Sequence, residues 1–240
     1  MALAAGSWHD APHMRRPERA PRDLAVLFDL DGTLTDSRAG ITGSIRHAMT
    51  CMGRDCPDDG VLAAYIGPPL RGTFTTLLET ADPEIIETAV RHYRARYDDV
   101  GLFENAVYDG VPEMLDAAAR LAGTLLVVTA KQQHVATRIL SHFGLARHFQ
   151  CIHGAEPGGR FDHKAELIGH LIERGAIRAE SAVMVGDRHL DMMAARAHRV
   201  RAIGALWGFG DRRELTDAGA DQLCESPRAL AACLARPAAS

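Results

Sequence analysis

The sequence predicts an α/β protein with a Rossmann-like, doubly wound parallel sheet and a small all-helical cap domain inserted after the first strand. After residue 105, short apolar runs alternate with segments of helical periodicity, which is typical of βαβ units. Before that point, one apolar run at 24–28 precedes a long helical block that contains no clear strand. Since the other strands follow this block, we interpret the block as an insertion.

These patterns divide the chain into three parts. Residues 1–22 contain several Arg and Pro and show no periodicity, so we expect a disordered N-terminal tail, in which Met14 is an alternative start. Residues 23–36 and 106–240 are expected to form the Rossmann-like catalytic core. Residues 37–105 are expected to form the helical cap.

Each element rests on its own pattern. The run LAVLF at 24–28 predicts a buried strand. In the cap, apolar residues recur at helical spacing, and Asp82-Pro83 is typical of a helix start. In the core we expect helices at 112–122, 132–143, 164–174, 189–198, 211–218 and from 227, and strands at 124–128, 149–152, 181–185, 200–203 and 221–224.

Composition excludes several classes of function. The chain has 240 residues and a net charge of −4, so no basic excess indicates a nucleic acid or an anionic membrane as partner. No apolar run approaches the roughly 20 residues of a membrane helix, and the N-terminus lacks a secretory pattern. The five cysteines form no CxxC pair, which favours reduced thiols. We expect a cytoplasmic monomer or homodimer.

Reactive groups gather at the predicted strand ends. Ligands of a doubly wound sheet bind beyond the carboxyl ends of the strands, so these side chains are expected to share one site. The groups, in chain order, are Asp29 and Asp31 after the first strand, Thr129 at the second, Lys164 after the third, and Asp187 with Asp191 after the fourth.

Paired carboxylates predict a metal site. Asp29 and Asp31 stand two residues apart on an extended segment, so their side chains point the same way and would share the site with Asp187 and Asp191. Several carboxylates cannot ionise together in one cleft without a cation. Mg²⁺ takes oxygen ligands and accepts a phosphate oxygen. The pattern therefore predicts Mg²⁺ and a small phosphomonoester as substrate.

Such a site supports phosphoryl transfer to a carboxylate. Asp29 would attack phosphorus and form an aspartyl-phosphate. Asp31 would protonate the leaving oxygen and then take a proton from the hydrolytic water. Thr129 and Lys164 would hold the phosphate oxygens.

At these residues the chain resembles the haloacid dehalogenase superfamily of phosphatases. The matching motifs occur in order from residue 24 onward. The resemblance implies Mg²⁺ bound by Asp29, the backbone carbonyl of Asp31, and Asp187, with Asp191 in support. The motifs are Asp29-Leu30-Asp31-Gly32-Thr33, Thr129, Lys164, and Gly186-Asp187 with Asp191.

Further segments resemble the phosphoglycolate-phosphatase-like group and, within it, a branch described as 5′-nucleotidases. The segments lie at 65–71, 92–94, 102–105, 142–145 and 186–188. One departure is Ala130-Lys131-Gln132, where the branch commonly has Ser-Lys-Pro. We therefore expect a 5′-nucleotidase, with phosphoglycolate phosphatase as the alternative and a sugar-phosphate phosphatase or mutase behind it. Arg71, Lys131 and Arg188 are candidate substrate contacts.

Each signal alone also fits an ordinary structural role, such as a solvated turn acid, a strand threonine, a surface lysine or a helix-capping aspartate. For Asp191, an acid on a helix surface or a partner that supports a metal ligand is nearly as good an interpretation as a direct ligand. A dehalogenase would not need Asp31 as an acid, and a phosphonate hydrolase would need a cap lysine, which residues 37–105 lack. A non-enzymatic binding protein is disfavoured by the full motif set.

Overall fold

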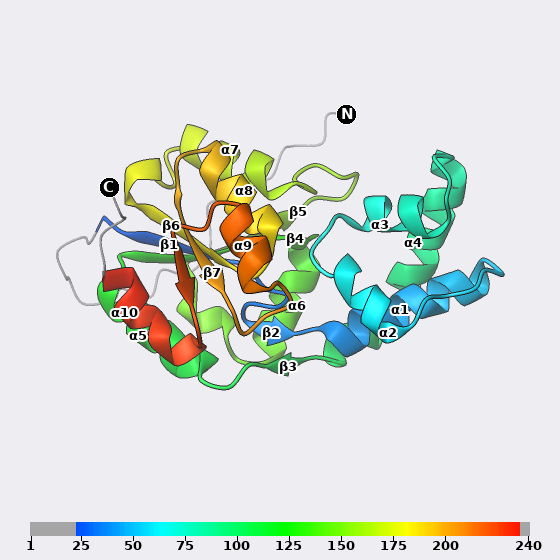
Figure 1. Ribbon diagram of the computed structural model, residues 1–240, viewed down its shortest axis with the longest axis horizontal. Coiled ribbons are helices and arrows are strands. Elements are labelled where there is room, and N and C mark those ends of the chain that lie inside the picture. Colours follow the sequence, from blue (N-terminus) through cyan, green and yellow to red (C-terminus); the bar gives the residue numbers. More distant parts are fainter. Residues whose placement is uncertain (1–22, 236–240) are drawn as a thin grey trace, which may run out of the picture.

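The computed structural model of the chain describes residues 23–235 and confirms the α/β class (Figure 1). A sheet of six strands has the order β5-β4-β1-β6-β7-β8, and all of its neighbours pair in parallel. The predicted tail at 1–22 lies outside the described residues. The strands are β1 (Ala25–Phe28), β4 (Thr124–Gln132), β5 (Cys151–Ala155), β6 (Ala182–Gly186), β7 (Arg201–Ala205) and β8 (Gln222–Cys224).

Helices cover both faces of the sheet. Successive strand residues point to opposite faces, so Phe28 and Leu27 belong to two separate apolar clusters. The Phe28 cluster includes residues of α5 (Val111–Leu121), α6 (Gln133–His142) and α10 (Leu230–Ala235). The Leu27 cluster includes residues of α7 (Lys164–Glu173), α8 (His189–Ala197) and α9 (Arg212–Asp217).

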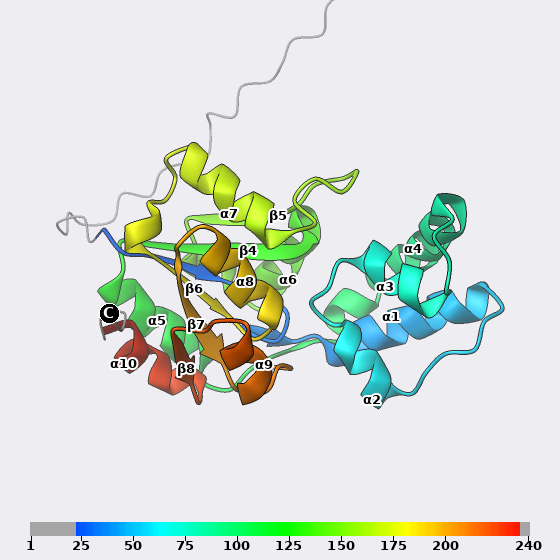
Figure 2. The same ribbon diagram turned by 45° about the horizontal axis from the view of Figure 1, so that its top comes forward.

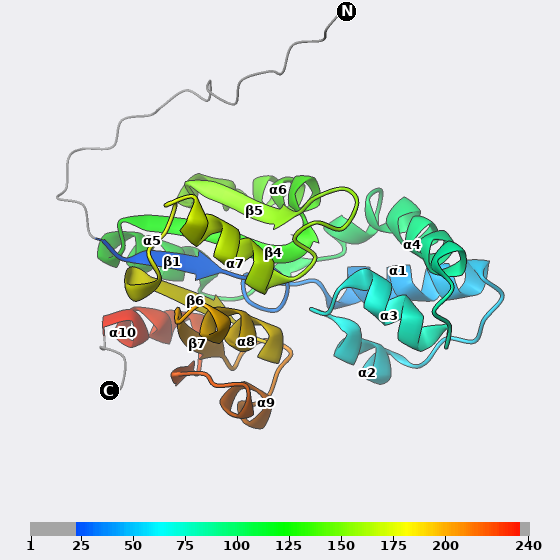
Figure 3. The ribbon, with the colours of Figure 1, turned by 90° about the horizontal axis from the view of Figure 1, so that it is seen from above.

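A group of helices lies at one end of the molecule (Figure 2). The arrowheads of β1, β4 and β5 point toward this end (Figure 3). We propose that residues 37–105 form a separate cap domain, and "cap" denotes this segment below. The cap helices are α1 (Arg38–Cys51), α2 (Asp59–Leu62), α3 (Leu70–Leu77) and α4 (Pro83–Tyr97). Asp82 caps the N-terminus of α4, the last α-helix of the cap, because its Oδ1 accepts a hydrogen bond from the Glu84 N–H at 2.9 Å.

Within the described part of the chain, no helix combines the length and the apolar character needed to cross a membrane.

The structure differs from the sequence prediction at a few element boundaries. A two-stranded antiparallel ribbon of β2 (Thr35–Asp36) and β3 (Ala106–Val107) joins the core to the cap. Strands this short have no periodicity by which a sequence would reveal them. The third core strand was expected at 149–152, but β5 begins at Cys151. A short 3-10 turn at Ala146–His148 precedes it, and the Phe149 N–H is used to close that turn on the Ala146 carbonyl at 3.2 Å.

The two chain segments at the base of the cap approach each other at glycine. The Gly40 N–H donates a hydrogen bond to the Glu104 carbonyl at 3.1 Å. A Cβ added to Gly40 would lie 1.9 Å from the Gly101 carbonyl oxygen, far inside van der Waals contact. The start of α1 therefore packs directly on the segment that returns to the core.

Gly40→Ala is expected to lower the melting temperature, because the methyl group forces these two backbone segments apart at a cost of about 1–3 kcal/mol. Gly72→Ala is the matched control, since Gly72 is an exposed helical residue whose Cβ would meet nothing within 4 Å. That substitution should stabilise the protein by about 0.5–1 kcal/mol. Equal melting temperatures for the two variants would contradict the close approach.

Candidate active site

The predicted reactive residues meet where the strand order reverses around β1. The chain runs from β1 to β4 and β5 on one side of β1, and then crosses from β5 to β6, β7 and β8 on the other side. This reversal opens a crevice beyond the strand ends. Asp29 follows β1 and Asp187 follows β6, and both are almost fully buried. Carboxylate oxygens of Asp29, Asp187 and Asp191 all lie within 4.8 Å of one another.

Lys164, the first residue of α7, lies between two of these carboxylates. Its Nζ is 2.6 Å from Asp29 Oδ2, and it also donates to Asp191 Oδ1. The other Asp191 oxygen accepts the Arg188 N–H at 3.0 Å. Because both Asp191 oxygens have protein partners, the geometry fits the supporting role that the sequence implied for this residue.

Asp187 lies in a close-fitting cradle. Thr33 Oγ1 donates to its Oδ1 at 3.0 Å, and the Phe209 N–H donates to its Oδ2 at 2.8 Å. A Cβ on Gly32, whose φ is +86°, would lie 2.1 Å from Asp187 Oδ2, and one on Gly208 would lie 2.3 Å from Asp187 Cβ. These two glycines are required for the backbone to approach the carboxylate.

Sequence analysis missed the segment 207–210. The Phe209 N–H of this segment contacts Asp187, as described above. In addition, Trp207 Nε1 donates to the Thr33 carbonyl at 2.9 Å, which holds the segment against the loop that carries Thr33. The available signal was a Trp-Gly-Phe-Gly run directly after a strand, at the same edge of the sheet as the other site residues.

Asp31 contacts the second lysine of the site. Lys131 Nζ is 3.1 Å from Asp31 Oδ2 and donates to the Tyr97 hydroxyl of α4 at 2.6 Å. The Lys131 N–H donates to Thr129 Oγ1 at 3.2 Å. The chain has only two lysines among its 27 basic residues, and both lie in this site.

The buried charges favour a cation. Burial raises the pKa of Asp29 to about 7, although Lys164 opposes the shift. Burial, with Asp191 and Asp29, also raises the pKa of Asp187 well above its ordinary value. For Lys164, burial lowers the pKa, but Asp191 and Asp29 outweigh that effect and raise it.

Two carboxylate oxygens have unused bonding capacity. Asp29 Oδ1 and Asp31 Oδ1 are buried and have no hydrogen-bond partner within residues 23–235. Buried anionic oxygens without a partner cost free energy that a ligand can recover. Together with the cluster of Asp29, Asp187 and Asp191, these oxygens could bind a hard divalent cation, which prefers oxygen ligands. A carboxylate oxygen of this kind could also form a bond to phosphorus.

A cavity of about 120 Å³ lies above these acids, between core and cap. Core residues Asp29, Asp31, Thr129, Lys131 and Lys164 line its inner part. The cap contributes aromatic, cyclic and basic side chains, which include Tyr65, Tyr93, Tyr97, Pro68, Pro69, Arg71 and Arg94.

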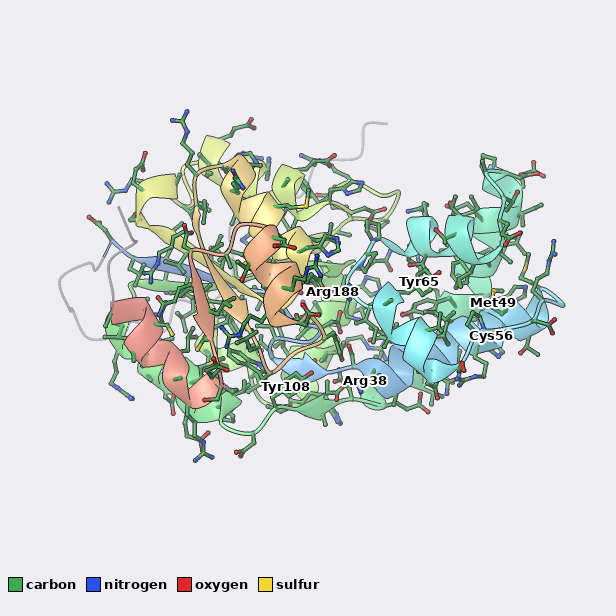
Figure 4. All side chains as sticks on the ribbon, in the orientation of Figure 1. Arg38, Met49, Cys56, Tyr65, Tyr108 and Arg188 are labelled. Atoms are coloured by element: carbon green, nitrogen blue, oxygen red, sulfur yellow. The ribbon has the colours of Figure 1, made fainter. Side chains whose placement is uncertain are left out.

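The three basic residues predicted to contact the substrate differ in their surroundings. Lys131 and Arg71 line the cavity, but Arg71 is held by Glu87 and by Asp162, the latter at 3.1 Å. Arg188 lies outside the cavity lining, at the edge of the core that faces the cap (Figure 4). Its guanidinium donates to the Ile66 carbonyl of the cap at 2.6 Å and to Glu214 at 2.8 Å, so it ties core to cap.

Comparison with known proteins places this arrangement among hydrolases. Residues 26–205 match the family model described as haloacid dehalogenase-like hydrolase. A 5′-nucleotidase of Pseudomonas aeruginosa is 44% identical over 190 residues, which cover 79% of this chain and 86% of that protein. Tyrosine-protein kinase PtkA of Mycobacterium tuberculosis is 39% identical over 77% of this chain and 62% of its own length.

More distant relatives agree with the fold and the family. A phosphoglycolate phosphatase of Agrobacterium fabrum is 31% identical over 80% of this chain and 84% of that protein. The crystal structure of a predicted phosphatase from Clostridium acetobutylicum superposes with a TM-score of 0.84 at 34% identity, and covers 90% of this chain and 99% of that one.

A divalent cation is expected to raise the melting temperature, and to raise it more at about pH 8 than at about pH 5. The pKa of Asp29 is raised in the fold, so the metal-free protein loses stability as the pH rises from about 4 to about 7 and this carboxyl ionises. A bound cation removes that penalty, whereas protons compete with it at low pH. Differential scanning fluorimetry with Mg²⁺ measures both shifts.

Asp187→Asn is the control for that measurement. The amide keeps the shape of the side chain and removes one ligand charge, so the Mg²⁺-dependent shift should largely disappear. A shift of equal size at both pH values, or one that survives Asp187→Asn, would contradict a carboxylate metal site.

Proposed function

The chain belongs to the family of haloacid dehalogenase-like hydrolases, and from this premise we propose that it is a Mg²⁺-dependent phosphomonoesterase that hydrolyses nucleoside 5′-monophosphates. The observation that carries the proposal is the environment of Asp29. Its Oδ2 is fixed by Lys164 at 2.6 Å, while its buried Oδ1 has no partner among the described residues. One oxygen is thus anchored and the other is available as a nucleophile.

In the first half-reaction, Asp29 Oδ1 forms a bond to phosphorus and the bond from phosphorus to the leaving oxygen breaks. Asp31 donates its proton to that oxygen as the alcohol departs. Lys164 and Thr129 hold the peripheral oxygens of the phosphoryl group. Lys131, 3.1 Å from Asp31 Oδ2, orients the acid.

In the second half-reaction, Asp31 takes a proton from a water molecule, whose oxygen bonds to phosphorus. The bond from phosphorus to Asp29 breaks, which releases inorganic phosphate and restores the carboxylate. A Mg²⁺ ion held by Asp29, the Asp31 carbonyl and Asp187, with Asp191 in support, would neutralise charge on the transferring group.

Two observations bear on the leaving group. Three tyrosines of the cap, Tyr65, Tyr93 and Tyr97, line the cavity and favour a leaving group with apolar or aromatic surface. The most similar relatives include a protein named 5′-nucleotidase at 44% identity. Both support nucleotides as the leading substrates.

Phosphoglycolate phosphatase is the second candidate. The cavity volume of about 120 Å³ is below the roughly 300 Å³ at which typical small-molecule pockets begin. A leaving group as small as glycolate would fit within it, whereas a nucleoside must extend to the mouth.

A substrate panel tests the proposal. We expect Mg²⁺-dependent phosphate release, with larger kcat/KM for nucleoside 5′-monophosphates than for 2-phosphoglycolate or sugar phosphates at equal concentration. Preference for 2-phosphoglycolate would overturn the nucleotide assignment and keep the phosphomonoesterase. No release from any of these substrates would overturn both.

Substitution of the two catalytic acids is expected to separate their roles. Asp29→Asn should abolish turnover of every phosphomonoester, because the amide is a poor nucleophile. Asp31→Asn should lower kcat by about 10²–10⁴-fold, with a smaller loss for p-nitrophenyl phosphate, whose leaving group needs little protonation. Asp109→Asn is the control, since Asp109 is an exposed acid paired with Arg228. Unchanged activity of Asp29→Asn would exclude it as the nucleophile.

A further inference from the structure

One basic side chain on the cavity has unused bonding capacity. Four basic residues line the cavity, and three of them are held by protein carboxylates. The side chain of Arg94 in α4 makes no hydrogen bond or ion pair with any residue that the structure describes, although its charge helps to lower the pKa of Glu87. It is half-buried, so its guanidinium is positioned but uncommitted. The committed residues are Arg71 with Glu87 and Asp162, Lys131 with Asp31, and Lys164 with Asp29 and Asp191.

An uncommitted acid accompanies this arginine. Asp98, four residues further along, also lines the cavity and is half-buried, and its carboxylate has no hydrogen-bond or ion-pair partner in residues 23–235. Side chains at i and i+4 on helical backbone lie on one face, with Cβ atoms about 5–6 Å apart. Both residues also line a shallow outer hollow with Arg91, Ala95 and Asp99, so they stand at the mouth of the cavity.

The mouth is where a nucleobase would lie. The cavity volume of about 120 Å³ accommodates a phosphoryl group and little more of a nucleotide. Tyr93 and Tyr97 line the wall between the mouth and Asp31, with stacked rings 5.2 Å apart. A planar base at the mouth would lie between this aromatic wall and the two charged side chains, which line the same cavity.

The two groups select among bases by their hydrogen-bonding patterns. A guanidinium donates two parallel bonds and therefore suits two adjacent acceptors, such as O6 and N7 of guanine. A carboxylate accepts two bonds and suits two adjacent donors, such as N1–H and the 2-amino group of guanine. Adenine has an amino group in place of O6, and hypoxanthine lacks the 2-amino group.

We infer that Arg94 and Asp98 are specificity-determining residues that recognise the base, and that the enzyme prefers guanine nucleotides. This inference rests on the proposed phosphomonoesterase function and adds the class of base to it. Arg94 lies in the segment 92–94 that resembles the 5′-nucleotidase branch, but the sequence assigned no role to its side chain, and Asp98 was not among the predicted site residues.

The test compares kcat/KM for GMP, IMP and AMP, with 2-phosphoglycolate as the base-free reference. The wild-type protein should prefer GMP to AMP by at least about tenfold, which is the order expected for one bidentate base contact. Arg94→Ala should lower kcat/KM for GMP and for IMP, each relative to kcat/KM for 2-phosphoglycolate, by about tenfold or more. Asp98→Asn should bring the GMP-to-IMP ratio close to one.

Arg213→Ala is the matched control, because Arg213 is an exposed helical arginine that lines neither the cavity nor the outer hollow. It should leave all three ratios as in the wild type. Calorimetry of GMP and AMP with the Asp29→Asn protein gives the same comparison without turnover, and GMP should bind at least about tenfold more tightly.

Equal kcat/KM for GMP and AMP in the wild type, or a GMP ratio that Arg94→Ala leaves unchanged, would overturn the inference. Turnover of 2-phosphoglycolate without turnover of any nucleotide would overturn it while keeping the phosphomonoesterase. Absence of turnover with every phosphomonoester would overturn the hydrolase itself, and this inference with it.

Discussion

The repulsion among buried carboxylates at one edge of the sheet is the constraint on which the rest of the site depends. Asp29, Asp187 and Asp191 have oxygens within 4.8 Å of one another in a place with almost no exposure to solvent. Lys164 neutralises part of this charge by contacting Asp29 and Asp191 together. Leaving one partner of such a buried pair alone costs about 3–5 kcal/mol. The remaining negative charge favours a cation, and the cation in turn favours a phosphate ester.

Chemistry and selectivity come from different parts of the chain in this account. The core supplies the acids and Lys164 from strand ends and from the start of α7, where a rigid parallel sheet fixes their positions. The cap supplies the tyrosine wall and the mouth. One apolar cluster continues from the core into the cap, and it includes Phe28 of the core and Ile45 of the cap. Polar contacts also cross between them, among them Lys131 with Tyr97, Arg71 with Asp162, and Arg188 with the Ile66 carbonyl. Asp29 is held by Lys164 of the core, so changes in cap side chains that line the cavity can alter the choice of leaving group without removing this contact.

Much of this arrangement could be predicted from the sequence, because it follows from local rules. Apolar runs reveal buried strands, and the polar residues after them must meet at one edge of a parallel sheet. The cradle of Asp187 could not be predicted, because Gly208 and Phe209 act through backbone contacts with a residue about 20 positions away. The ion pairs and hydrogen bonds of Arg71 and Arg188 also depend on residues that are distant in the sequence. Periodicity locates a helix face but does not reveal which charges on it are already paired.

The most direct test of the central claim is chemical trapping of the intermediate on Asp29. The enzyme is mixed with substrate and Mg²⁺, quenched within one turnover and reduced with borohydride, which converts an aspartyl-phosphate to homoserine. Peptide mass spectrometry then locates the reduced residue. The account predicts homoserine at position 29 alone, and only when substrate and metal are both present. Turnover without any reduced residue, or reduction at position 31 instead, would contradict it.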